Sequence, residues 1–127
     1  MERRCLQAVT SLLALVPISA GLLGALRGPA AFGIDPLLVG ADLDSHVRYL
    51  SGLLFAIGLG FWSTVPSIEK RTGRFRLLTG LVFVGGMMRL LALPATGVPG
   101  WPMRIGLALE LVVTPLLALW QARVSRG

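Results

Sequence analysis

The sequence predicts an all-α membrane protein, built as an up-down bundle of four transmembrane helices. The composition is the first indication, because 54% of the 127 residues are hydrophobic and only 14% are charged, a balance outside the range of soluble domains. The apolar residues also fall into four runs, each close to the ~20 residues that a helix needs to cross a bilayer. Finally, the basic residues flank these runs. We therefore expect one domain over residues 1–127, with the lipid bilayer as its surroundings.

The four spans are expected at about residues 5–26, 47–65, 75–93 and 103–120. Eight of the twelve Lys and Arg residues lie before the first run, between the second and third runs, or after the fourth. Because positively charged segments stay on the cytoplasmic side, both termini are expected there, in a multi-pass protein of the inner membrane. The net charge of +6 is explained by this topology and by anionic lipid, so no nucleic-acid partner is expected.

The first span follows Arg3 and Arg4 and resembles a secretory signal peptide. Small residues at 19–21 match the pattern of a signal-peptidase cleavage site. The apolar run continues to Leu26, which is longer than a usual signal core. We therefore expect an uncleaved span. Pro17 lies within it and predicts a kink, because proline cannot donate the helical hydrogen bond.

The second span begins in a polar cluster. Asp42 or Asp44 is expected to cap this helix at its N-terminus, and Asp44 also precedes Arg48 by one turn. In helical register Gly52 shares a face with Arg48. Small residues at that spacing allow another helix to approach closely, so this face is expected to pack. The preceding connection, residues 28–42, is unusually apolar and is expected to lie on the membrane surface or over the helix ends.

The third and fourth spans each carry a charge. Arg89 follows Gly85 by four residues in the third span, and Glu110 lies deep in the fourth. If the two helices run antiparallel about the Gly/Pro turn between them, Glu110 lies level with Gly86 and Arg89 with Leu107. Arg89 and Glu110 then differ in height by about one helical turn. Isolated charges within a membrane are unfavourable, so we predict an ion pair between them. Pro115 predicts a second kink nearby.

These features predict one polar site near the non-cytoplasmic ends of the helices. Arg48 is expected at a similar depth to the predicted ion pair, with Tyr49 and His46 as hydrogen-bonding neighbours. His46 is about 160° around the helix from Arg48, so it alternatively faces lipid headgroups or the loop. The candidate ligand-binding residues are Asp44, His46, Arg48, Tyr49, Arg89 and Glu110.

Four interpretations of this cluster stay open. It is a structural network that locks the helices together, or a pocket that binds a lipid-like or amphipathic small molecule or a membrane segment of a partner protein. A third is a channel or transporter that forms a homo-oligomer and uses Glu110. The last is a membrane enzyme with Glu110 or His46 as acid and base. Catalytic residues cannot be assigned.

Cofactor chemistry has no positive signal in the sequence. There is one histidine and one cysteine, Cys5, with no phosphate-binding loop, no nucleophile motif and no HExxH motif. Met87 and Met88 have no further soft ligands near them in the sequence, which favours packing over metal binding. We expect no cofactor and no metal.

The segments DSHVRYLSGLLFAIGLGFW, GGMMRLLAL and ALELVVTPLLALWQ carry a resemblance to a family of small bacterial four-helix membrane proteins, classed only as a domain of unknown function. The likeness covers nearly the whole chain. It implies a four-span membrane protein and singles out positions without implying an activity. Those positions are His46, Arg48, Tyr49, Gly52, Arg89 and Glu110. A looser likeness to small four-helix multidrug exporters fails, because their first span needs an acidic residue and this one has none.

Overall fold

The computed structural model describes residues 1–127 and is helical, without strands. Four helical segments are long and apolar enough to cross a membrane: Glu2–Phe32, Ala41–Ser67, Thr72–Thr96 and Trp101–Arg126. The predicted all-α class with four spans is therefore confirmed. Each segment extends a few residues beyond its apolar run, since helical hydrogen bonding continues into the polar flanks. The protein is a multi-pass membrane protein.

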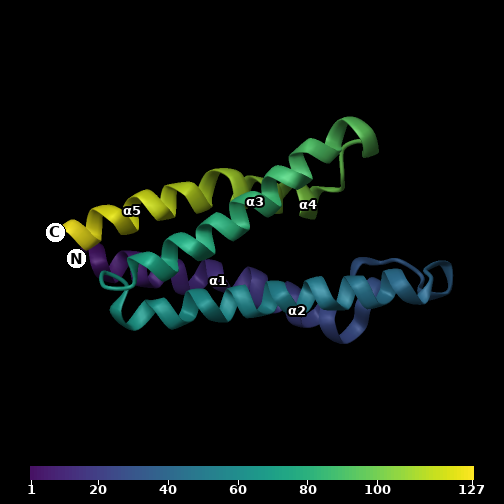
Figure 1. The fold of residues 1–127 in the computed structure, drawn as a ribbon, viewed down its shortest axis with the longest axis horizontal. Helices are drawn as coiled ribbons and strands as arrows, with labels where there is room; N and C mark the ends of the chain where they lie inside the picture. The colour runs from purple at the N-terminus through teal and green to yellow at the C-terminus, as the bar shows by residue number, and fades with distance from the viewer. The chain divides into compact units, whose positions relative to one another are not determined.

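The chain folds into two compact units. The first unit comprises residues 8–65, and the second comprises residues 1–7 together with residues 66–127. Helix α1 (Glu2–Arg27) therefore begins in the second unit and continues through the first. Figure 1 shows the order of the helices along the chain.

The first unit contains most of α1, helix α2 (Ala41–Thr64), and two short 3-10 turns between them, Gly28–Phe32 and Pro36–Leu38. Glycines let α1 and α2 approach closely. A Cβ added at Gly21 would lie 2.7 Å from the Ser51 carbonyl oxygen. A Cβ at Gly58 would lie 3.0 Å from the Ile18 backbone nitrogen. Close backbone approach through small residues is a common way for membrane helices to pack.

Two predictions about α2 are wrong. A Cβ added at Gly52 would meet nothing within 4 Å, so the close approach occurs on the face of Ser51 and Gly58, one residue around the helix. Neither Asp42 nor Asp44 caps α2. The N-cap residue is Gly40, and there is no hydrogen bond from the backbone of the first turn to a capping side chain. Both aspartates lie inside the first turn, where Asp44 pairs with Arg48 in place of the backbone.

The second unit contains helix α3 (Thr72–Thr96) and an antiparallel segment made of α4 (Trp101–Ala108), a π-helical turn (Leu109–Val113) and α5 (Thr114–Arg126). The wide turn ends next to Pro115, which has no backbone N–H to donate to the carbonyl one turn earlier. The backbone N–H and Oγ1 of Thr114 instead both donate to the Leu109 carbonyl oxygen. The kink predicted at Pro115 is thus a π-helical turn.

The core of the second unit lies where the chain ends meet the connection before α3. Leu6, Ile68 and Phe75 are completely buried there, and so is the side chain of Gln121. Gln121 Nε2 donates to the Ile68 carbonyl oxygen at 2.8 Å and to Thr72 Oγ1 at 3.0 Å. This buried amide ties α5 to the start of α3.

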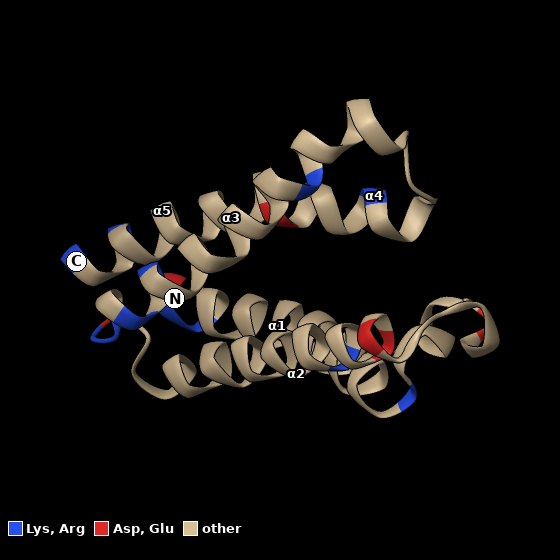
Figure 2. Ribbon diagram, turned by 45° about the vertical axis from the view of Figure 1, so that its right-hand side comes forward, with Lys and Arg blue, Asp and Glu red and all other residues tan.

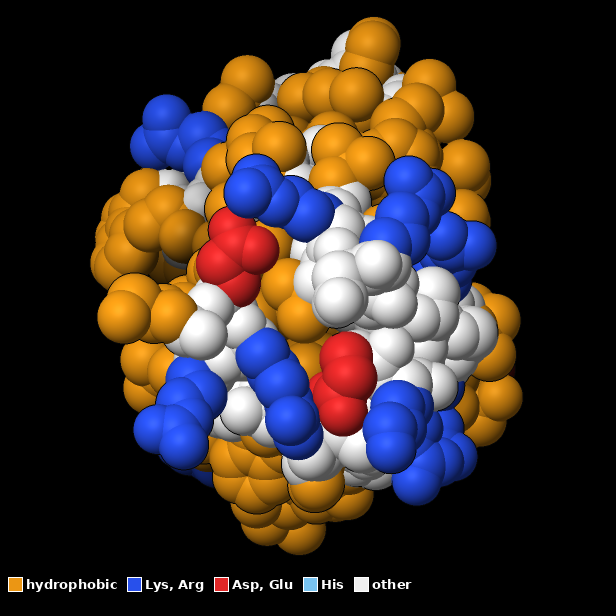
Figure 3. All heavy atoms as spheres, turned by 90° about the vertical axis from the view of Figure 1, so that its left-hand side faces the viewer, with side chains coloured by type: hydrophobic (Ala, Val, Ile, Leu, Met, Phe, Trp, Pro, Cys, Tyr) orange, Lys and Arg blue, Asp and Glu red, His pale blue; other side chains and the backbone are white.

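Basic side chains gather on the same end of the second unit, around two acidic groups (Figure 3). Arg3 Nε pairs with Glu69 Oε2 at 2.9 Å, and Arg123 Nη2 pairs with Glu2 Oε1 at 3.1 Å. The N-terminal residues are thereby joined both to the connection before α3 and to the C-terminal helix. We call this end, with residues 1–7, 66–76 and 120–127, the basic end.

Candidate functional site

Glu110 lies in the π-helical turn of the second unit, directly against α3. A Cβ added at Gly86 would lie 2.7 Å from Glu110 Cβ and 3.2 Å from Glu110 Oε2. Only a residue without a side chain at position 86 leaves room for the carboxyl group. The π-helical turn adds a residue to the helical turn there and is a feature often found at functional sites.

Arg89 is the ionic partner of Glu110, as predicted. Its Nη2 lies 3.5 Å from Glu110 Oε1, and the two side chains are 39% and 20% exposed. In Figure 2 a basic segment of α3 lies beside an acidic segment of the helix that faces it. Nη1 of Arg89 lies 3.7 Å from the Met103 sulfur, a weak acceptor. The guanidinium group thus makes one long ionic contact and one weak hydrogen bond.

The other carboxylate oxygen has no partner. Glu110 Oε2 is buried and receives no hydrogen bond, although buried polar atoms nearly always have one. Arg89, which carries five N–H donors, remains partly exposed beside it. The pair therefore has a free hydrogen-bond acceptor inside the unit, Glu110 Oε2, and N–H donors at the surface, on Arg89. Such an arrangement can bind a molecule that has both an anionic and a hydrogen-bond-donating group.

Arg48, in the first unit, has a different environment. Its Nε lies 2.8 Å from Asp44 Oδ2, and its Nη1 donates to the carbonyl oxygens of Leu26 at 2.8 Å and Ala25 at 3.3 Å. Those carbonyls belong to the last turn of α1, which has no helical partners for them. Gly28, with a φ of +60°, packs on this pair. Arg48 therefore closes the C-terminus of α1.

His46 and Tyr49 are exposed on α2, and no hydrogen bond or ion pair joins them to the pairs described above. The structure brings together Asp44 with Arg48 in the first unit, and Arg89 with Glu110 in the second. That all six residues form one site stays a prediction.

The antiparallel alignment of the two spans predicted Glu110 level with Gly86, and the structure confirms this contact. Sequence reasoning missed the buried role of Gln121. Gly85 and Gly86 are adjacent in the sequence, and only Gly86 faces Glu110. The register that selects between them depends on the π-helical turn.

A family model described as a domain of unknown function, DUF4345, matches residues 5–121. No curated protein and no solved structure matches the chain.

Proposed function

We propose that this chain, which belongs to the DUF4345 family, binds the polar group of a lipid-like or amphipathic small molecule at Arg89 and Glu110, without catalysis. The observation that carries the proposal is the buried, unpartnered Oε2 of Glu110 beside a half-exposed arginine. A fully structural ion pair would be expected to satisfy both oxygens, because an unpartnered buried acceptor costs about 1–3 kcal/mol.

The ligand class follows from the donors and acceptors. Arg89 supplies a planar cationic group suited to a phosphate or carboxylate, and Glu110 Oε2 accepts a hydrogen bond from a hydroxyl or amine. The exposed surface of α3, of α4 and of the connection between them is apolar, with Leu90, Val98 and Ile105 exposed. An amphipathic molecule can bind the polar Arg89–Glu110 pair and the apolar surface around it at the same time. A membrane helix of a partner protein that carries a polar residue can do so as well.

We place the protein in a bacterial inner membrane with both termini in the cytoplasm. The support is the charge distribution: the basic end carries eight of the chain's twelve Lys and Arg residues, and such residues are retained on the cytoplasmic side. In this topology Arg89 and Glu110 face the outer leaflet.

Transport is the second candidate, because Glu110 lies within a span, in a π-helical turn adjacent to Pro115. Interrupted helices and intramembrane carboxylates recur in transporters. A chain of this size would act as a homo-oligomer. Substrate-dependent proton flux in proteoliposomes, lost in Glu110→Gln, would favour this candidate over simple binding.

The binding proposal is tested by native mass spectrometry of the protein purified in mild detergent. We expect a co-purified mass on the wild-type protein. Arg89→Gln should lower its occupancy about tenfold, in line with the loss of a charge-assisted hydrogen bond, and Glu110→Gln should lower it as well. Arg104→Gln is the control, since Arg104 is exposed on α4 and makes no ion pair.

Thermal unfolding of the same samples separates binding from structure. If Arg89→Gln and Glu110→Gln leave the bound mass unchanged but lower the melting temperature, the pair is a structural network and the binding proposal is wrong. Equal losses of bound mass in Arg89→Gln and Arg104→Gln would also contradict it, because they would indicate a general charge effect.

A further inference from the structure

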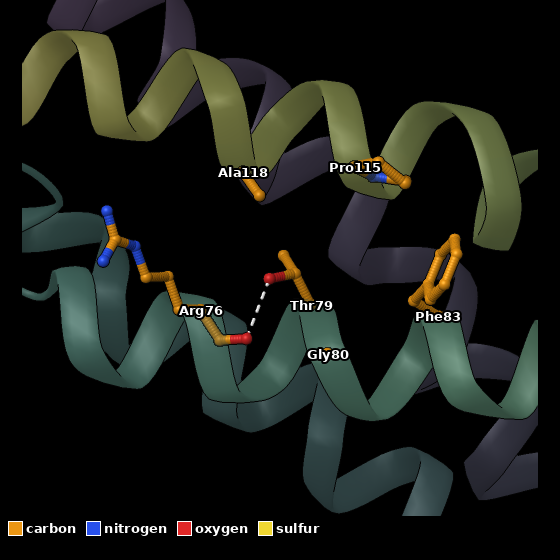
Figure 4. A pocket seen from close by; sticks show the side chains of 6 residues that line it. All are labelled: Arg76, Thr79, Gly80, Phe83, Pro115 and Ala118. Carbon is orange, nitrogen blue, oxygen red and sulfur yellow. Dashed lines mark hydrogen bonds between the residues drawn. The ribbon is translucent and has the colours of Figure 1, made fainter.

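A groove lies between α3 and α5 of the second unit. Along α3 its Phe83 end is about 9 Å from Arg89 and its Arg76 end about 20 Å, given 1.5 Å per residue. Its volume is about 270 Å³. The lining residues, shown in Figure 4, are Arg76, Thr79, Gly80, Phe83, Pro115 and Ala118. None of them belongs to the Arg89–Glu110 pair, so the groove is a separate feature.

The walls of this groove are apolar apart from Arg76 and Thr79. Thr79 does not offer its hydroxyl to a ligand, because Oγ1 donates to the Phe75 and Arg76 carbonyl oxygens, each at 3.0 Å. Gly80 contributes no side chain, and a Cβ there would meet nothing within 4 Å. Phe83 and Pro115 close the end away from Arg76 (Figure 4). The groove is thus a concave apolar surface within the membrane-spanning part of α3.

Arg76 stands at the opposite end of the groove, in the second turn of α3. Its side chain is exposed and makes no ion pair and no hydrogen bond, whereas Arg3 and Arg123 of the same basic end are paired with glutamates. Phe83 follows seven residues later, which is about 10 Å along the helix. The guanidinium group of Arg76 therefore lies at the level expected for lipid headgroups. The apolar part of the groove runs from it toward the membrane interior.

We propose that this groove binds one anionic phospholipid, with an acyl chain along Gly80 and Phe83 and the phosphate at Arg76. Every exposed helix of a membrane protein touches lipid, but two features select for a bound molecule here. The groove is open but is lined by residues of both α3 and α5, so an acyl chain lying along it contacts two helices. The unpaired guanidinium group of Arg76 matches the charge of a phosphate.

The test compares two lipids on the full-length protein in detergent by native mass spectrometry. The probes are phosphatidylglycerol and phosphatidylcholine with identical acyl chains, added separately at equal concentration. We expect one phosphatidylglycerol molecule to be retained in preference to phosphatidylcholine. Arg76→Gln should lower phosphatidylglycerol occupancy about fivefold, and Arg76→Lys should keep most of it. Arg126→Gln, which alters another exposed arginine of the basic end, should resemble the wild type.

A second pair of variants tests the apolar half of the site. Gly80→Leu should fill the groove without a steric clash and remove both lipids, whereas Gly85→Leu, at an equally open position of α3, should leave binding unchanged. Three results would overturn the proposal: no preference between the lipids, equal effects of Arg76→Gln and Arg126→Gln, or retention of lipid in Gly80→Leu. A protein dimer that Gly80→Leu separates would also overturn it, since a second copy would then occupy the groove.

Discussion

At the scale of single residues, Arg48 shows how a membrane protein satisfies a helix end. The last turn of α1 leaves carbonyl oxygens without helical donors, and Arg48 donates to those of Ala25 and Leu26. Asp44 holds the guanidinium group from one turn away on α2. The left-handed backbone of Gly28 allows the chain to turn beside this pair. The three residues together connect the end of α1 with the start of α2.

Arg48→Ala should therefore lower stability by about 1–2 kcal/mol, through the loss of charge-assisted hydrogen bonds and of a cation at a helix C-terminus. Thermal unfolding in detergent, followed by circular dichroism, measures the change. Arg27→Ala serves as the control, because Arg27 is exposed in the last turn of α1 and makes no such hydrogen bond. Equal melting temperatures for the two variants would show that Arg48 does not act as a cap.

At the scale of elements, the π-helical turn decides which face of the α4–α5 segment meets α3. It brings Glu110 against Gly86, and beyond it Gln121 Nε2 donates to Thr72 Oγ1 at the start of α3. In both cases a polar side chain on one helix meets a position on the other that accommodates it, either by lacking a side chain or by offering an acceptor. The match fixes the register of the two helices.

Gly86→Ala should disrupt this match, because the added Cβ would lie 2.7 Å from Glu110 Cβ. We expect a loss of about 1–3 kcal/mol from overpacking, together with loss of any mass bound at Arg89 and Glu110. Gly85→Ala is a matched control on the neighbouring residue, where a Cβ meets nothing within 4 Å. Thermal unfolding and native mass spectrometry of the two variants provide the comparison, and similar behaviour of both would contradict the assigned contact.

At the scale of the whole molecule, charge is distributed unevenly along the chain. The basic residues that flank the spans are concentrated at the basic end of the second unit (Figure 3). The connection between α1 and α2 instead carries Asp35 and exposes Leu37 and Leu38, which are 93% and 83% exposed. Apolar side chains on a connection suit the membrane interface. That this segment lies on the membrane surface or over the helix ends stays a prediction.

The proposed topology is tested with single cysteines in a Cys5→Ser background. Gly73→Cys lies near the start of α3 and Gly40→Cys lies just before α2, and a Cβ fits at both positions without contact. In intact bacterial cells with a permeabilised outer membrane, a membrane-impermeant maleimide should label Cys at position 40 but not at position 73. Labelling of position 73 alone would place the termini outside.

The sequence predicted much of the fold and part of the candidate site. Long apolar runs with basic flanks were sufficient for the class and the four spans, since a bilayer requires helices of a particular length and excludes unpaired backbone groups. The pairing of Arg89 with Glu110 followed from an antiparallel turn and the helical rise. The cap on α2, the packing role of Gly52 and the burial of Gln121 were beyond sequence reasoning, because each depends on which side of a helix faces its neighbour.

The sequence by itself thus determined where the helices are and which residues carry charge within them. Only the tertiary structure decided that Gln121 is buried against the start of α3, that Arg48 caps the end of α1, and that Arg76 stands at one end of a groove. Hydropathy and length indicate which residues form a membrane-spanning helix. They do not indicate how that helix is rotated about its axis. Contacts between helices depend on that rotation, and a single π-helical turn beside Pro115 is enough to change it.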